Sequence, residues 1–200
     1  MGRLTFILGG ARSGKSTFAQ QLALERGQNV VYIATAQAGD SEMKARITTH
    51  KTNRPVHWRT LEITHQLAAS LTPFPKHTHI FLLDCLTMLV SNIILQGIIS
   101  DEEPDEKMVS QSVDEEISTL LAVIQKNQAD WIIVSNEVGM GLVPPYPLGR
   151  LYRDLLGKAN QQIATVAHEI YLMMAGMAIP VHQIARQTHD KPGETPLRRK

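Results

Sequence analysis

Short, continuously apolar runs alternate along the chain with longer segments of helical spacing. Runs rich in β-branched and aromatic residues predict four strands, at residues 4–8, 30–34, 79–84 and 131–135. Because these runs are apolar throughout rather than at alternate positions, they are typical of a parallel sheet with helices on both faces. Phe18, Leu22 and their neighbours predict a helix over 16–26, which Gly27 ends. The pattern favours a three-layer α/β fold with a mostly parallel central sheet.

The C-terminal third of the chain predicts one more helix and a hairpin. A proline-rich connector leads into a predicted helix over 148–167. Two apolar runs, at 169–175 and 179–185, are joined by a short segment around Gly176. Two such runs with a glycine-containing connection are typical of a β-hairpin.

The chain is expected to form one domain. Its 200 residues, 43% of them hydrophobic, are enough for one well-packed core and too few for two. Acidic residues at 101–116 suit a loop that leads into the start of a helix. The final residues are polar and include two prolines, which is typical of disorder. These features predict a domain over 1–185 and a disordered tail over 186–200.

Charge and cysteine content exclude several classes of function. With 20 basic and 19 acidic residues the net charge is +1, so the chain lacks the basic field of a dedicated nucleic-acid binder. The single cysteine, Cys85, excludes an internal disulfide and a cysteine-based zinc site, and it fits a reducing compartment. Neither a signal-like N-terminus nor an apolar run of about 20 residues is present. We therefore expect a cytoplasmic protein without a membrane span.

One stretch matches the phosphate-binding pattern G-x-x-x-x-G-K-[ST], between a predicted strand and a predicted helix. It consists of Gly9, Gly10, Ala11, Arg12, Ser13, Gly14, Lys15 and Ser16. Backbone N–H groups of such a loop wrap a polyphosphate, and its glycines leave room for the phosphates. Lys15 is expected to contact the β- and γ-phosphates, and Ser16 to ligate Mg²⁺. A glycine-rich turn with a solvated lysine is the alternative; a dinucleotide-binding loop is excluded because Ala11 replaces its second glycine.

An acidic residue, Asp84, closes the third predicted strand. In P-loop proteins a carboxylate at this place orients the magnesium shell or its water. The alternative is an ordinary strand-end aspartate that caps the next helix, which is predicted to start near Thr87.

Cations, hydroxyls and an imidazole gather after the second predicted strand. If this segment is helical, Arg46, His50 and Arg54 share one face, which could address a polyphosphate. Neutral imidazole is a nucleophile near pH 7, so His50 is a candidate for covalent catalysis. From spacing alone a solvated surface histidine is the simpler interpretation, and His57 and His65 are competing candidates.

Further motifs follow one another between residues 4 and 182. Besides the phosphate-binding loop they are Tyr-Ile-Ala-Thr-Ala at 32–36, Arg-Ile at 46–47 with His50 and Arg54-Pro55, Trp-Arg-Thr-Leu-Glu at 58–62, Asp-Cys-Leu-Thr at 84–87 with Ser91-Asn92, and Ser-Asn-Glu-Val-Gly-Met-Gly at 135–141. The combination is far more specific than the loop alone. In it the chain closely resembles the bifunctional adenosylcobinamide kinase/adenosylcobinamide-phosphate guanylyltransferase family of cobalamin (vitamin B12) assembly.

The resemblance implies two reactions on a P-loop fold similar to RecA-type proteins. The first phosphorylates the aminopropanol hydroxyl of adenosylcobinamide with ATP or GTP. The second transfers GMP from GTP onto that phosphate, and its products are adenosylcobinamide-GDP and pyrophosphate. The resemblance further implies Mg²⁺, small-molecule substrates and a homotrimer.

The resemblance also implies the residues of the site. His50 would carry GMP covalently, Lys15 would act on the phosphates, and Ser16 and Asp84 would hold Mg²⁺, partly through water. Nucleotide contacts would fall on the loop at 9–16 and on Ala34, Thr35, Ala36, Lys51, Thr52, Asn53, Arg54, Glu62 and Asp84. The loop at 136–141 would line the site. Two alternatives stay open: a kinase-only enzyme in which His50 merely binds phosphate, and a GTP-binding switch without a small-molecule substrate.

Overall fold

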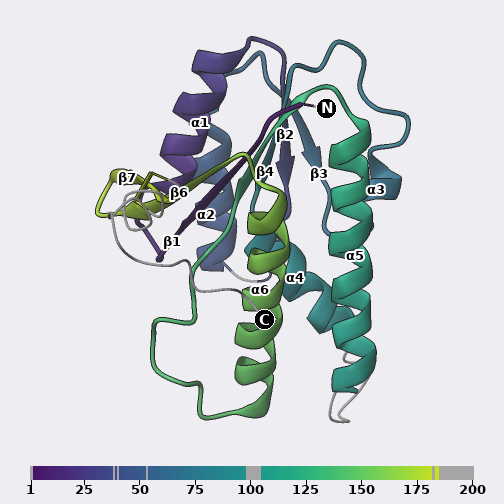
Figure 1. Ribbon diagram of the computed structural model, residues 1–200, viewed down its shortest axis with the longest axis vertical. Coiled ribbons are helices and arrows are strands. Elements are labelled where there is room, and N and C mark those ends of the chain that lie inside the picture. The colour runs from purple at the N-terminus through teal and green to yellow at the C-terminus, as the bar shows by residue number, and fades with distance from the viewer. Residues whose placement is uncertain are drawn as a thin grey trace, which may run out of the picture.

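A seven-stranded sheet with the strand order β3-β2-β4-β5-β1-β6-β7 forms the centre of the molecule (Figure 1). The computed structural model describes residues 2–37, 39, 41–52, 54–97, 105–181 and 183–184, and it describes only the backbone of Glu42, Met43, Arg46, Thr49 and His50. All neighbouring strands from β3 to β6 pair in parallel, and only β6 and β7 are antiparallel. The carboxyl ends of six strands therefore lie along one edge of the sheet, where ligands bind in open α/β folds.

The four predicted strands are confirmed to within one or two residues. They are β1 (Leu4–Gly9), β2 (Val30–Ala34), β4 (Ile80–Asp84) and β5 (Asp130–Val134). Their side chains are buried almost without exception, as continuous apolar runs require in a sheet covered on both faces. The predicted helix after the first strand is α1 (Lys15–Arg26), and the Gly27 N–H ends it by donating to the Ala23 carbonyl at 3.1 Å.

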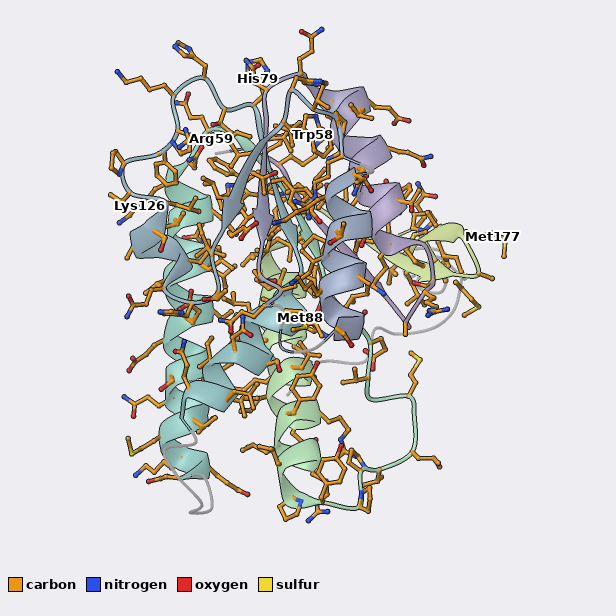
Figure 2. The ribbon with its side chains drawn as sticks, turned by 180° about the vertical axis from the view of Figure 1, so that it is seen from behind. Trp58, Arg59, His79, Met88, Lys126 and Met177 are labelled. Atoms are coloured by element: carbon orange, nitrogen blue, oxygen red, sulfur yellow. The ribbon has the colours of Figure 1, made fainter. Side chains whose placement is uncertain are left out.

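Two apolar layers separate the sheet from its helices. On one face, residues such as Phe6, Phe81 and Trp131 pack against α3 (Leu67–Ser70), α4 (Leu86–Gln96), α5 (Glu106–Lys126) and α6 (Pro147–Val166). On the other face, residues including Ile7, Tyr32 and Ile132 pack against Ala19 and Ala23 of α1. Both views show α2 (Ser41–Thr52) beside α1 (Figures 1 and 2). The three-layer expectation is confirmed.

The edge strand β3 (Arg59–Glu62) was not predicted from the sequence. It has only one apolar residue, Leu61, and its other three side chains are exposed, so it lacks the apolar run that marks the central strands. Helix α2 ends at Thr52, so Arg54 lies beyond it and is not part of the predicted helical face.

The C-terminal hairpin forms as predicted, with a shorter connection. Strand β6 (Glu169–Met174) pairs with β1, and β7 (Met177–Pro180) folds back on β6. The turn consists of Ala175 and Gly176, both with positive φ, so the second strand begins two residues earlier than predicted. The predicted strand limit at 185 and the predicted tail at 186–200 lie outside the described residues.

The acidic segment leads into α5, as predicted. Asp105 caps this helix, because its carboxylate accepts hydrogen bonds from the backbone N–H groups of Lys107 and Met108 at 3.0 and 3.1 Å. Residues 101–104 of the segment lie outside the described residues. Among the described residues, no helix combines the length and the apolar character needed to cross a membrane.

Candidate nucleotide site

The phosphate-binding loop connects the carboxyl end of β1 to the amino end of α1. Two of its glycines adopt conformations that side chains disfavour: Gly9 has φ +155°, and Gly14, which caps α1, has φ +95°. A Cβ on Gly9 would lie 2.5 Å from the carbonyl oxygen of Met173. The loop curls back on itself through a 3.3 Å hydrogen bond from the Ser13 N–H to the Gly10 carbonyl. This is the strand–loop–helix setting that the sequence predicted.

Neighbouring segments hold the loop on two sides. The N–H of Gly176, at the tip of the hairpin, donates to the Ser13 carbonyl at 3.0 Å. The N–H of Glu137, which follows β5, donates to the Gly9 carbonyl at 3.0 Å. The loop is therefore fixed by backbone bonds to elements that are far from it in the sequence, which preorganises its remaining N–H groups.

The Lys15 side chain is buried against the loop. Its Nζ donates to the Gly10 carbonyl at 2.6 Å, and the residue is only 8% exposed. Burial lowers the pKa of Lys15, and the nearby Cys85 and Asp84 oppose that shift. The solvated-lysine alternative is therefore wrong, and the ammonium lies where a phosphate-binding loop requires one.

Asp84 ends β4 and is held by a tyrosine. The Tyr32 hydroxyl donates to Asp84 Oδ2 at 2.6 Å. The N-cap residue of α4 is Cys85, and no side chain caps this helix. Among the described residues, no other hydrogen bond reaches the Asp84 carboxylate. The helix-capping alternative is therefore wrong.

The carboxyl end of β2 is tied to its neighbours through Thr35. Its hydroxyl donates to the Cys85 carbonyl at 2.7 Å and accepts from the Cys85 N–H at 2.9 Å. The Asn92 amide donates to the carbonyls of Thr35 and Thr64 at 2.8 and 3.1 Å. Thr35 and Ala34 are both buried, and Ala36 is half-buried. The Thr35 hydroxyl thus joins the end of β2 to the residue that follows β4.

Arg54 lies against the face of Tyr32. Its guanidinium carbon is 3.6 Å from the ring centroid, and its Nε and Nη1 are buried without a hydrogen-bond partner among the described residues. Trp58 also stacks on Tyr32, with centroids 6.5 Å apart, and it lies in the apolar layer between the sheet and α1 (Figure 2). Buried donors without partners are costly unless a ligand satisfies them.

Lys51 and Glu62 form an ion pair between the end of α2 and the end of β3. Both side chains are about half exposed, at 49% and 60%. The structure thus joins two residues that the sequence assigned to the nucleotide. Asn53 and the side chain of His50 lie outside the described residues; the His50 backbone belongs to the last turn of α2.

The loop after β5 begins next to the phosphate-binding loop, where Glu137 bonds to Gly9. The Asn136 N–H donates to the Thr87 hydroxyl at 2.7 Å, and the Asn160 amide donates to the Asn136 carbonyl at 3.1 Å. Glu137 accepts from the Gly139 N–H at 2.6 Å. Beyond it, Met140 and Leu142 are almost fully exposed, at 81% and 98%. The loop after β5 thus carries exposed apolar residues.

Tyr32 is the site residue that sequence reasoning missed. Ala34 pairs with Asp84 across β2 and β4, so Tyr32, two residues earlier on the same face of β2, is a diagonal neighbour of Asp84. A tyrosine two positions before the end of a buried strand was the available signal, but it could be used only once the strand order was known.

Comparison with known proteins shows the family of this chain. Residues 5–181 match the family described as cobinamide kinase / cobinamide phosphate guanyltransferase. The chain belongs to this family. It is 39% identical over 181 residues to the bifunctional adenosylcobalamin biosynthesis protein CobU of Escherichia coli K12, covering 89% of this chain and 99% of that protein. The corresponding CobP of Pseudomonas aeruginosa is 43% identical over 175 residues, covering 88% and 95%. The resemblance read from the sequence is confirmed.

Among solved structures, the fold of this cobinamide kinase / cobinamide phosphate guanyltransferase family member is similar to that of an ATPase from the type III secretion system of pathogenic bacteria. The TM-score is 0.51 at 12% identity, over 95% of this chain and 54% of that chain. A likeness at this identity concerns the fold alone. It agrees with the predicted P-loop architecture, which the strand order and the hairpin also support.

Proposed function

We propose that this protein is a bifunctional enzyme that phosphorylates the aminopropanol hydroxyl of adenosylcobinamide with ATP or GTP and then transfers GMP from GTP to the product. Membership of the family supports the pair of reactions. The observation that carries the nucleotide chemistry is the phosphate-binding loop with Lys15 buried over it. The final products are adenosylcobinamide-GDP and pyrophosphate.

In the kinase step the loop binds and orients the donor nucleotide. Its backbone N–H groups and the amino end of α1 face the phosphates, and Lys15 balances the charge on the β- and γ-phosphates. The substrate hydroxyl attacks the γ-phosphorus and gives up its proton as a new P–O bond forms. The bond from the γ-phosphorus to the leaving nucleoside diphosphate breaks. Little else is required of the protein beyond positioning and charge.

Mg²⁺ fits the oxygen ligands near the loop. Asp84 offers a carboxylate, and Ser16 offers a half-buried hydroxyl at the start of α1. Within the described ranges, no group of three or more His, Cys, Asp or Glu side chains could hold a metal by itself. Mg²⁺ suits such a place because it is usually held by one or two protein oxygens together with substrate phosphates and water. When bound, it would neutralise charge on the phosphates.

For guanylyl transfer we assign the nucleophile to His50. Its ring nitrogen attacks the α-phosphorus of GTP, so a P–N bond forms while the bond to pyrophosphate breaks. A phosphate oxygen of the phosphorylated cobinamide then attacks the same phosphorus, and the P–N bond breaks to release the imidazole. Arg54, with its unpaired buried donors, and Lys51 stabilise the negative charge that develops on the phosphates.

The remaining nucleotide contacts are proposed from the same resemblance. They are residues 9–16, Ala34, Thr35, Ala36, Thr52, Asn53, Glu62 and Asp84. All of these that lie on β1, β2, β3 and β4 are at the carboxyl ends of those strands, which supports a common site.

The test of this function is incubation with GTP labelled at the α-phosphate. We expect acid-labile, base-stable label on the protein, since a phosphoramidate has that stability, and no label on His50→Ala. His57→Ala and His65→Ala are matched controls that should label normally. Label on His50→Ala would refute the assigned nucleophile, and the absence of label on the unsubstituted protein would leave a kinase-only enzyme. Sustained pyrophosphate release should require phosphorylated cobinamide. GTP consumption that does not depend on cobinamide would instead favour a GTP-binding switch.

We further propose that the protein acts in the cytoplasm as a homotrimer with small-molecule substrates only. Exposed apolar residues of the loop after β5, namely Met140, Leu142, Val143 and Tyr146, support burial against another copy or against the corrinoid. Light scattering coupled to gel filtration tests the trimer, which a mass of one chain would refute.

A further inference from the structure

One buried tyrosine touches two residues of the proposed nucleotide site. Tyr32 is 1% exposed, and its hydroxyl donates to Asp84 Oδ2 at 2.6 Å. The Arg54 guanidinium carbon lies 3.6 Å from the centre of the same ring. Tyr32 thus connects the end of β4, beside the phosphate-binding loop, with the segment that follows α2.

The bond to Asp84 comes from the phenol hydroxyl of a tyrosine that is 1% exposed, and it reaches one oxygen of the carboxylate. A hydrogen bond to one carboxylate oxygen fixes the orientation of Asp84 while its other oxygen stays available to Mg²⁺ or a bound water.

Arg54 lies over the face of the ring, with its guanidinium carbon 3.6 Å from the ring centre. A cation over an aromatic face is attracted by the ring electrons. Two of these nitrogens, Nε and Nη1, are buried and have no hydrogen-bond partner in the described part of the chain. Tyr32 thus holds Arg54 in place, and neither nitrogen is committed to another described residue.

We propose that Tyr32 is a positioning residue for the nucleotide, whose hydroxyl orients Asp84 for the Mg²⁺ shell and whose ring holds the Arg54 guanidinium for phosphate binding. This inference rests on the proposed function only in that Asp84 and Arg54 are taken as nucleotide contacts. The two halves of the proposal use different parts of one side chain, so different substitutions separate them.

Tyr32→Phe removes the hydroxyl and keeps the ring. We expect the Mg²⁺ concentration that half-maximally enhances GTP binding, measured by calorimetry, to rise about tenfold, since hydrogen bonds to charged groups have effects of this size. GTP affinity in EDTA should stay within about twofold of wild type, because the ring still holds Arg54. In a Tyr32→Phe/Asp84→Asn double variant, the loss should equal that of Asp84→Asn alone.

Tyr32→Leu removes the ring as well. GTP affinity in EDTA should then fall about five- to tenfold, as it should for Arg54→Met. The Tyr32→Leu/Arg54→Met double variant should be no more than about twofold weaker than the worse single variant, because both changes remove the same interaction. If Tyr32→Leu does not fold, the Phe variant and its double variant still decide the first half.

Tyr171→Phe is the matched control, since it removes the hydroxyl of a tyrosine whose ring packs edge-on against Phe18. It should bind Mg²⁺ and GTP as wild type does. An unchanged Mg²⁺ requirement in Tyr32→Phe would overturn the proposal. So would a loss of GTP affinity in Tyr32→Leu/Arg54→Met that equals the product of the two single losses. Because binding is measured without cobinamide, a protein that binds GTP in this way but turns over no cobinamide would refute the proposed function and leave the role of Tyr32 standing.

Discussion

Gly9→Ala is expected to destabilise the protein by about 2–4 kcal/mol. The added Cβ would lie 2.5 Å from the carbonyl oxygen of Met173 and 2.7 Å from Ser13 Oγ. The Met173 carbonyl belongs to β6, and Met173 is the residue paired with Gly9, so it cannot retreat without separating β6 from β1. The φ of +155° is in addition one that alanine rarely adopts.

Two contributions destabilise the Gly9→Ala variant, and a third partly offsets them. Overpacking costs about 1–3 kcal/mol, and a residue held in a sparsely populated backbone region costs about 1–3 kcal/mol. Alanine loses less conformational entropy on folding than glycine, which offsets about 0.4–1 kcal/mol. The central sum is close to 3 kcal/mol, and for a chain of this size it lowers the melting temperature by roughly 6–12 °C.

Urea unfolding followed by circular dichroism measures the effect, with Gly157→Ala as the matched control. Gly157 lies within α6, and an added Cβ there would meet no atom within 4 Å. That variant should gain about 0.5–1 kcal/mol, because alanine favours a helix interior over glycine. Gly9→Ala with wild-type stability would show that the junction of β1 and β6 tolerates a side chain, and the packing argument for this glycine would be refuted.

Three further predictions concern charged residues. Lys15→Met should lower the kinase kcat about 10²–10³-fold without lowering the melting temperature, because burial already disfavours the ammonium; a stable, active variant would contradict this. Burial raises the pKa of Glu169, hydrogen bonds from Arg26 and Thr5 lower it, and the net shift of this pKa is downward. The Glu169 carboxylate therefore stabilises the fold above about pH 4.5, and this stabilisation is lost as the pH falls below that. Glu169→Gln should therefore cost about 1–2 kcal/mol in unfolding experiments at pH 7 and less at pH 3, and an equal loss at both would count against it. Lys51→Ala should change stability by less than about 1 kcal/mol, since the pair with Glu62 is exposed, yet weaken GTP binding measurably in calorimetry.

Elements with a continuous apolar signal could be predicted from the sequence, and those without one could not. The central strands are buried on both faces, so each appears as an apolar run. Edge strand β3 has Leu61 as its only apolar residue, which gives no periodicity to detect. The sequence also did not predict that α2 ends at Thr52, because the segment after the second strand is mostly polar.

The site was predictable where chemistry is local in the sequence. The phosphate-binding loop is one contiguous motif, so its strand–loop–helix setting could be foreseen. The contacts of Tyr32 depend on β2 lying beside β4, between residues 52 positions apart in the chain, and no local pattern carries that information. The Lys51–Glu62 pair likewise depends on β3 pairing with β2, which the sequence did not reveal.

The two halves of the site are fixed by different kinds of interaction. The phosphate-binding loop is held by backbone hydrogen bonds from Gly176 and Glu137, which side-chain changes leave intact. The segment that carries His50 is attached by side chains, through the exposed Lys51–Glu62 pair and the contact of Arg54 with Tyr32. His50 and Arg54 are only four positions apart, so at most about 14 Å of chain links the proposed nucleophile to its anchor. Loss of that anchor should therefore impair guanylyl transfer more than the kinase step, because only the former depends on where α2 ends.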